Sequence, residues 1–299
     1  MATATRHQAG EALPRALIAI GAPCAGVLLI AFFLIRGFPY HELGESIANR
    51  IEQSHGIQLT IGEVRPVLQL AGPALESTQL RVKFPNRSPL QIERALVRPA
   101  WSLSWLAGEP ALHIELESPS GKADGTLRWN AVVSWVGTIR DARPELSPIA
   151  DWIPAGGLEG TLEAAVDVSR GELGLEGRVE FEVRDGSLLL PGLSVPLPFE
   201  SLTGAVSLGG DVYAKLSKLS FEGPVTSGSG SGKIGRAERL EQASIDFEFK
   251  LDIKPSLAGA VSGAGVQVNS GGDAIAKISG TVAKPQIRQT PRMRTRSGR

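Results

Sequence analysis

The stretch SIDFEFKLDI, residues 244–253, alternates without a break between two kinds of side chain. Apolar residues (Ile245, Phe247, Phe249, Leu251, Ile253) take turns with charged ones (Asp246, Glu248, Lys250, Asp252). Successive side chains of a β-strand point to opposite faces of the sheet. This period of two therefore predicts an antiparallel strand with one buried apolar face and one solvent-exposed polar face. The same alternation recurs at 57–61, 111–118, 158–169 and 172–184. The soluble part of the chain is therefore predicted to be mainly β.

Composition supports this fold class and narrows the function. The chain of 299 residues holds 35 glycines and 20 prolines, and only 5% of its residues are aromatic. Such a composition is typical of many short strands with frequent turns. Lys plus Arg and Asp plus Glu balance at 31 each, so no net field attracts the whole protein to nucleic acid. We predict no nucleic-acid partner.

Glycines and one helical pattern suggest how the strands are divided. Glycine stands just before a strand-like Gly-x-apolar step at five places, which we interpret as strand starts in a meander: 125, 160, 204, 232 and 280. Trp129, Val132, Val136 and Ile139 recur at helical spacing, and a proline-rich segment follows. Residues 129–157 are therefore predicted to be a helix and connection between an N-terminal β subdomain, 37–128, and a C-terminal antiparallel β subdomain, 158–287.

The N-terminal region predicts a membrane anchor. Residues 16–35 are twenty residues without a charge, long enough to cross a hydrocarbon core of roughly 30 Å. The alternative is a cleaved signal peptide, but the run exceeds the usual apolar length of about 7–15 residues and no small-x-small site follows it. We expect a transmembrane helix at 16–36, a cytoplasmic segment at 1–15, and a bulk that is periplasmic at a bacterial inner membrane.

Two further segments have predicted structure of their own. Tyr40, Leu43, Ile47 and Ile51 form one apolar stripe, which predicts an amphipathic helix ending near Gly56. This helix either lies on the bilayer or packs onto the first strands. The tail 288–299 is rich in arginine and is predicted to be disordered. It is either a solvated terminus or a contact for anionic lipid or nucleic acid.

The segment SFEGPVTSGSGSGKIG, residues 220–235, resembles a nucleotide-binding loop. A dinucleotide loop needs a buried strand directly before its glycines and a substantial helix after them, and neither is present. The P-loop pattern fails as well, because Ser227 and Ile234 stand where it requires glycine and a hydroxyl residue. We interpret the glycines as a flexible hairpin crossing in a sheet whose neighbours approach closely, and predict no nucleotide cofactor.

No pattern of residues predicts catalysis or a metal site. Glu115 with Glu117, and Glu180 with Glu182, are paired carboxylates, but the wet face of a sheet explains both pairs. Cys24 is the single cysteine, the four histidines are scattered, and no serine lies in a G-x-S-x-G elbow. We predict no enzyme, and no catalytic, cofactor-binding or metal-binding residues. Trp101 and Trp105 mark either packing against the sheet or an interface.

Three stretches carry a family resemblance. FPYHELGESIANRIEQSHGIQLTIGEV, after a single predicted span, resembles the opening of the general secretion pathway protein N (GspN) family of type II secretion and, in part, of AsmA-like envelope proteins. The block from Leu75 to Leu127, with RPAWSLSWLAGEP inside it, resembles the next block of these families. ISGTVAKPQI, residues 278–287, resembles the close of their C-terminal repeats. The resemblance covers about 37–128 and 200–287, and residues 129–157 match no motif.

The resemblance implies an inner-membrane anchor, a curved periplasmic β-sheet, open or folded over, and an accessory role in the type II secretion system. The AsmA-like relatives imply an alternative, a sheet whose apolar face handles or transfers lipid. Neither family offers catalytic residues. From the residues, an open sheet with an apolar face has to bury that face or offer it to a ligand. We expect contacts with other secretion components by strand addition, tested by crosslinking at 245–253 and 275–282, and contacts with membrane lipids.

Overall fold

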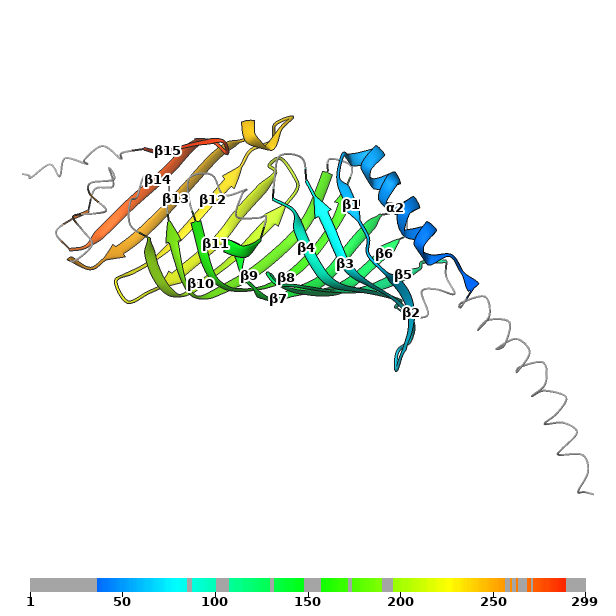
Figure 1. Ribbon diagram of the computed structural model, residues 1–299. Helices are drawn as coiled ribbons and strands as arrows, with labels where there is room; N and C mark the ends of the chain where they lie inside the picture. Colours follow the sequence, from blue (N-terminus) through cyan, green and yellow to red (C-terminus); the bar gives the residue numbers. More distant parts are fainter. Residues whose placement is uncertain are drawn as a thin grey trace, which may run out of the picture.

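The computed structural model describes residues 37–84, 88–100, 108–129, 132–147, 157–171, 174–189, 196–255, 259, 262, 268–269 and 271–288. These residues form one open antiparallel sheet of 15 strands with few helices, which confirms the predicted fold class at this level (Figure 1). In the described part of the chain no helix is both long and apolar enough to cross a bilayer. The predicted segments 1–15 and 16–36 lie outside the described residues.

The strands follow one another across the sheet almost entirely in chain order, from β1 through β3 to β15, with β2 paired to β3. Their bounds are β1 Gln58–Thr60, β2 Val64–Gln69, β3 Gly72–Lys83, β4 Leu90–Pro99, β5 Ala111–Ser118, β6 Gly121–Trp129, β7 Val133–Ala142, β8 Gly157–Gly171, β9 Gly174–Leu189, β10 Leu197–Leu208, β11 Ala214–Glu222, β12 Thr226–Ile234, β13 Ser244–Ile253, β14 Asp273–Thr281 and β15 Lys284–Arg288. Chain neighbours joined by short turns pair antiparallel, so the sheet is a long meander.

The predicted amphipathic helix is present as α2, Tyr40–His55. It ends at Gly56, whose φ of 66° lies in the left-handed region, and the Gly56 amide donates a hydrogen bond to the Glu52 carbonyl. The helix packs against β1 and β2 at the N-terminal end of the sheet. Two short 3-10 helices are also described: η2, Pro144–Leu146, and η4, Leu240–Gln242.

The helix predicted at residues 129–139 is wrong, because residues 133–142 form strand β7. This strand pairs with β6 on one side and with β8 on the other, so the hydrogen-bond ladders of both neighbours fix it in extended form. Its β-branched valines also favour a strand. Strands of both predicted subdomains thus belong to one sheet, whose pairing continues through β7.

The recurring glycines do not mark strand starts, contrary to the sequence interpretation. Gly125, Gly204 and Gly232 lie inside β6, β10 and β12. Residue 160 lies inside β8 and residue 280 inside β14, both with positive φ. Gly125, Gly204 and Gly232 allow neighbouring side chains to pack closely, whereas Gly160 and Gly280 allow a backbone conformation that other residues rarely adopt.

Candidate functional site

One face of the sheet is apolar from end to end. Residues that lie opposite each other on paired strands share a face, so the register defines rows that cross the sheet. Two neighbouring rows consist of apolar residues and glycine. The first, from β4 to β14, is Ala95, Leu116, Ala123, Ile139, Ala164, Phe181, Gly204, Leu219, Gly230, Phe249 and Ala276; the second, from β3 to β14, is Leu75, Val97, Ile114, Gly125, Gly137, Val166, Val179, Val206, Leu216, Gly232, Phe247 and Ile278. We call the side that carries them the apolar face.

Aromatic rings and glycines alternate on this face. Five phenylalanines lie directly opposite a glycine of the next strand, and each ring occupies the space that a side chain on that glycine would need: Phe181 over Gly204, Phe199 over Gly186, Phe221 over Gly228, Phe249 over Gly230 and Phe247 over Gly232. A ring that covers a glycine on the next strand fills the space left by the missing side chain and fixes the pairing register of the two strands. The apolar face is therefore continuous although it contains many glycines.

The glycine-rich segment 220–235 is explained by this packing. Residues 226–234 form the regular strand β12, paired on both sides, and not the flexible hairpin that the sequence suggested. The expected close approach of neighbours is confirmed, since rings from β11 and β13 lie over its glycines. The serines between them belong to the opposite, polar face.

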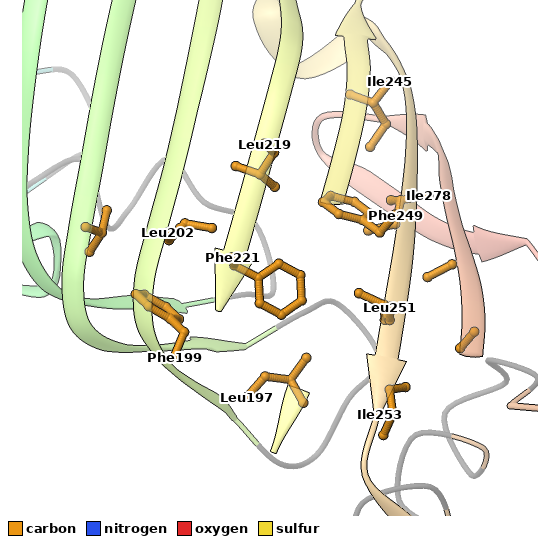
Figure 2. Packing of buried hydrophobic residues seen from close by; sticks show 13 residues of the cluster. Leu197, Phe199, Leu202, Leu219, Phe221, Ile245, Phe249, Leu251, Ile253 and Ile278 are labelled. Carbon is orange, nitrogen blue, oxygen red and sulfur yellow. The ribbon is translucent and has the colours of Figure 1, made fainter. Parts of the chain in front are cut away.

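In the C-terminal half the sheet buries its apolar face. Thirteen buried residues form one cluster drawn from β9, β10, β11, β13 and β14, from Val183 to Ile278 along the chain. Figure 2 shows Phe199 of β10, Phe221 of β11, and Leu251 and Ile253 of β13 around the same interior space. Since the described helices pack mainly against β1, β2 and β8, curvature of the sheet supplies much of this burial.

In the N-terminal half the same face forms an open groove of about 550 Å³. Its walls come from β2 to β5 and from the start of α2, and they are apolar except for Arg98: Phe38, Tyr40, Pro66, Pro73, Ala74, Leu75, Val97, Arg98, Pro99 and Leu112. We call it the apolar groove. The sequence did not reveal it, because the register of four strands brings these residues together. Its size falls in the range of ligand sites, about 300–1,000 Å³.

The polar face carries ion pairs. Arg184 donates to Glu182 at 2.8 Å and also reaches Glu163 at 3.5 Å, while Lys277 lies 2.9 Å from Glu248. Asp124 accepts hydrogen bonds from Arg140 and Thr138, and the first of these lowers the pKa of Asp124 most. Exposed pairs of this kind contribute little to stability because solvent screens them. These ion pairs make the polar face hydrophilic and do not form a binding site.

The carboxylate pairs considered for catalysis lie on this polar face. The hydrogen bond from Arg184 lowers the pKa of Glu182, whereas a general acid needs a raised pKa. Arg178 lies 2.6 Å from Glu180. Glu115 lies 3.3 Å from His113, and Glu117 lies 3.9 Å from Lys122. Each carboxylate thus has a basic neighbour, which is the arrangement of a solvated sheet surface.

A wider hollow of about 970 Å³ extends along the sheet from β7 to β12. Its lining includes Glu163, Glu180, Glu182, Arg140 and Lys218. Members of the first apolar row, such as Ile139, Phe181 and Leu219, line it together with these charged residues, so residues of both faces bound it. Charges of both signs line it, so it selects no particular ligand charge.

One acidic residue is buried. Glu76 on β3 is 6% exposed and lies between two arginines: Arg65 donates from Nε at 2.8 Å, and Arg94 donates to the other carboxylate oxygen. The hydrogen bond from Arg94, and then that from Arg65, lower the pKa of Glu76. The three residues join β2, β3 and β4 next to the apolar groove. They hold the strands that form its walls.

The edges of the sheet differ from the sequence expectation. Residues 245–253 lie in β13, which pairs with both β12 and β14, and residues 275–281 lie in β14, which pairs with both β13 and β15. Neither strand offers an edge for strand addition. Among the described strands, β15 is the last of the sheet, and Pro285 within it suits an edge position.

Several sequence predictions concern residues outside the described part of the chain. Trp101, Trp105 and Cys24 are among these, and so is the tail 289–299. Within the described ranges no three His, Cys, Asp or Glu side chains gather as they would around a metal ion. No protein-family model, curated protein or solved structure matches the chain.

Proposed function

We propose that this protein is a non-enzymatic component of the bacterial envelope, anchored in the inner membrane by residues 16–36, that assists type II protein secretion by binding. The family resemblance of residues 37–128 and 200–287 supplies the secretion role. The observation that supports a binding role is the apolar groove, the part of the apolar face that stays open at β2 to β5. An open apolar groove of this size is typical of a site that binds another molecule.

The proposed contact with secretion partners is strand addition at β15. This strand already pairs with β14 through residues 284–288, and a partner strand would continue the same ladder. Gln286 is exposed at the middle of β15 and suits a photoactivatable crosslinker. Ser229, exposed on the central strand β12, is the matched control.

We expect the crosslinker at residue 286 to trap an envelope component of the secretion machine in cells, and the crosslinker at residue 229 to trap none. Deleting the gene should lower the amount of protein secreted by the type II route. Restoring the full chain should restore it. Unchanged secretion in the deletion strain, together with no adduct at residue 286, would remove the support for this role.

The apolar groove favours a second candidate, lipid handling. Apolar walls with a single basic residue, Arg98, suit an acyl chain with an anionic headgroup. Val97→Asp places a charge in the groove, and Val136→Asp places the same charge on the exposed polar face as a control. If the groove holds lipid, the full chain purified in detergent will retain less phospholipid with Val97→Asp than with Val136→Asp. Equal retention by the two variants would argue against this candidate.

A further inference from the structure

The hairpin formed by β2 and β3 has an apolar tip. Ten consecutive residues, 66–75, carry no charge. Leu68 is 86% exposed and Leu70 is 112% exposed, the highest values among the large apolar side chains of the described residues. Single exposed leucines are ordinary, but two on one uncharged projecting hairpin form a patch that water disfavours. Figure 1 shows this hairpin projecting beyond the body of the sheet.

Two aromatic residues, Phe38 just before α2 and Tyr40 at its first position, lie close to the hairpin. Phe38, which is 48% exposed, and Tyr40 line the apolar groove together with Pro66 and Pro73 of the hairpin. Their ring centroids are 5.1 Å apart. Leu68 is paired with Pro73, so it continues the groove toward the hairpin tip. The aromatic pair, the groove and the two leucines form one apolar surface, which we call the hairpin surface.

The position of this surface in the chain identifies its partner. Phe38 follows Arg36, the end of the predicted membrane span, by two residues, which reach at most about 7 Å. The hairpin surface is thus held where the bilayer meets water, the depth at which Phe, Tyr and Trp anchor proteins. Two basic residues lie next to it: Arg98 lines the groove, 3.8 Å from Glu115, and Arg65 lies beside the hairpin and is bonded to Glu76. Basic residues suit anionic headgroups.

We propose that the hairpin surface, with Leu68 and Leu70 at its tip, inserts into the interfacial layer of the same membrane that holds the anchor. This second contact orients the sheet on the bilayer and brings the mouth of the apolar groove to the lipid surface. The proposal rests on the proposed membrane anchor but not on either functional role.

The test is fluorescence quenching of the full chain in vesicles of phosphatidylethanolamine and phosphatidylglycerol that contain spin-labelled lipid. An environment-sensitive fluorophore is attached at one cysteine at a time. The native Cys24 reports on the anchor. In a Cys24→Ser background, Leu70→Cys reports on the hairpin tip, and Ile275→Cys reports on an exposed apolar residue of β14, near the other end of the sheet.

We expect spin-labelled lipid to quench the fluorophore at residues 24 and 70 and not at residue 275. Quenching at 24 without quenching at 70 overturns the proposal and leaves the anchor intact. Quenching at neither position overturns both. Quenching at 70 and 275 alike also overturns the proposal, since the whole sheet would then lie on the membrane. A fluorophore at residue 70 that responds to an added protein extract but not to spin-labelled lipid would show a protein partner instead.

A second set of variants tests the leucines themselves. Ala71 is exposed in the same turn and carries the fluorophore as Ala71→Cys. Adding Leu68→Gln and Leu70→Gln removes the apolar tip but keeps its length and solubility. We expect quenching at residue 71 to be lost in this variant, and its persistence would contradict insertion by the leucines.

Discussion

The ring of Phe249 on β13 lies over Gly230 on β12, so that a methyl group on Gly230 would stand 2.7 Å from Phe249 Cδ1. Real side-chain carbons do not approach this closely, so the ring excludes any larger residue at position 230. The same relationship holds between Phe247 and Gly232, one step along the same two strands. Stability of this part of the sheet therefore depends on pairs of residues rather than on single ones.

The first prediction concerns this pair. Gly230→Val should destabilise the protein by about 1–3 kcal/mol, as overpacking does, and Phe249→Ala by about 3–5 kcal/mol. The double variant should lose less than the sum, because the valine then occupies the space of the ring. Urea unfolding followed by tryptophan fluorescence measures all three. Ser229→Val, on the exposed face of the same strand, is the control, and additive losses would contradict the packing described here.

The second prediction concerns a buried hydroxyl. Thr226 is 2% exposed and lies opposite Ile253, and its Oγ1 has no hydrogen-bond partner among the described residues. A buried polar group without a partner costs about 1–3 kcal/mol. Thr226→Val keeps the shape and removes this cost, so we expect the unfolding midpoint to rise. Thr203→Val on β10 adds no such gain, and a lower midpoint for Thr226→Val would show that the hydroxyl is satisfied.

The third prediction concerns pH. The arginine hydrogen bonds hold the pKa of Glu76 below its ordinary value of 4.5. The stabilisation from this group is therefore fully present above pH 4.5 and is lost as the pH falls through the lower folded value. Glu76→Gln should cost on the order of 1–2 kcal/mol at neutral pH, because both arginines lose a charged acceptor.

The same variant should also flatten the loss of stability in acid. Unfolding of the parent and of Glu76→Gln, followed as the pH is lowered through 4.5, should show the two curves converging. Glu93→Gln, an exposed glutamate on β4, is the matched control and should follow the parent. A constant difference between the parent and Glu76→Gln at all pH values would exclude this linkage.

The fourth prediction concerns backbone conformation at a bulge. Asp185 on β9 has a φ of 49°, where β-branched residues are strongly disfavoured. The pairing register of β8 and β9 shifts near this residue. Because of the shift, Val183 and Gly186, three residues apart, both lie on the apolar face. Asp185→Val should cost about 1–2 kcal/mol and Asp185→Asn little. Asp167→Val, at an exposed position of β8 with regular pairing, should cost less than Asp185→Val in the same unfolding assay.

Much of the fold could be predicted from sequence because each strand carries its own alternation. Residues 244–253 are strand β13 and residues 158–169 lie in β8, as their period of two indicates. Local sequence features also predict the helix at Tyr40–His55, because its apolar stripe and the glycine that ends it can both be recognised in the sequence.

The sequence predictions failed where contacts with neighbouring strands, and not the local pattern, determine the structure. Val136 is an exposed apolar residue on the polar face of β7, and it completed a false helical spacing with Trp129 and Ile139. The glycines of β12 looked flexible because their covering rings come from β11 and β13. The apolar groove depends on strand register, and the position of β15 at the end of the described sheet depends on strand order. The pattern of a single strand predicts neither.

The central claim is that the apolar face binds another molecule while the polar face does not. A photoactivatable crosslinker placed at Leu112, in the apolar groove, tests this in living cells against one at Thr138, exposed on the polar face. We predict an adduct at residue 112 and none at residue 138, and its mass identifies lipid or protein. No adduct at residue 112, or equal adducts at both positions, would contradict the claim.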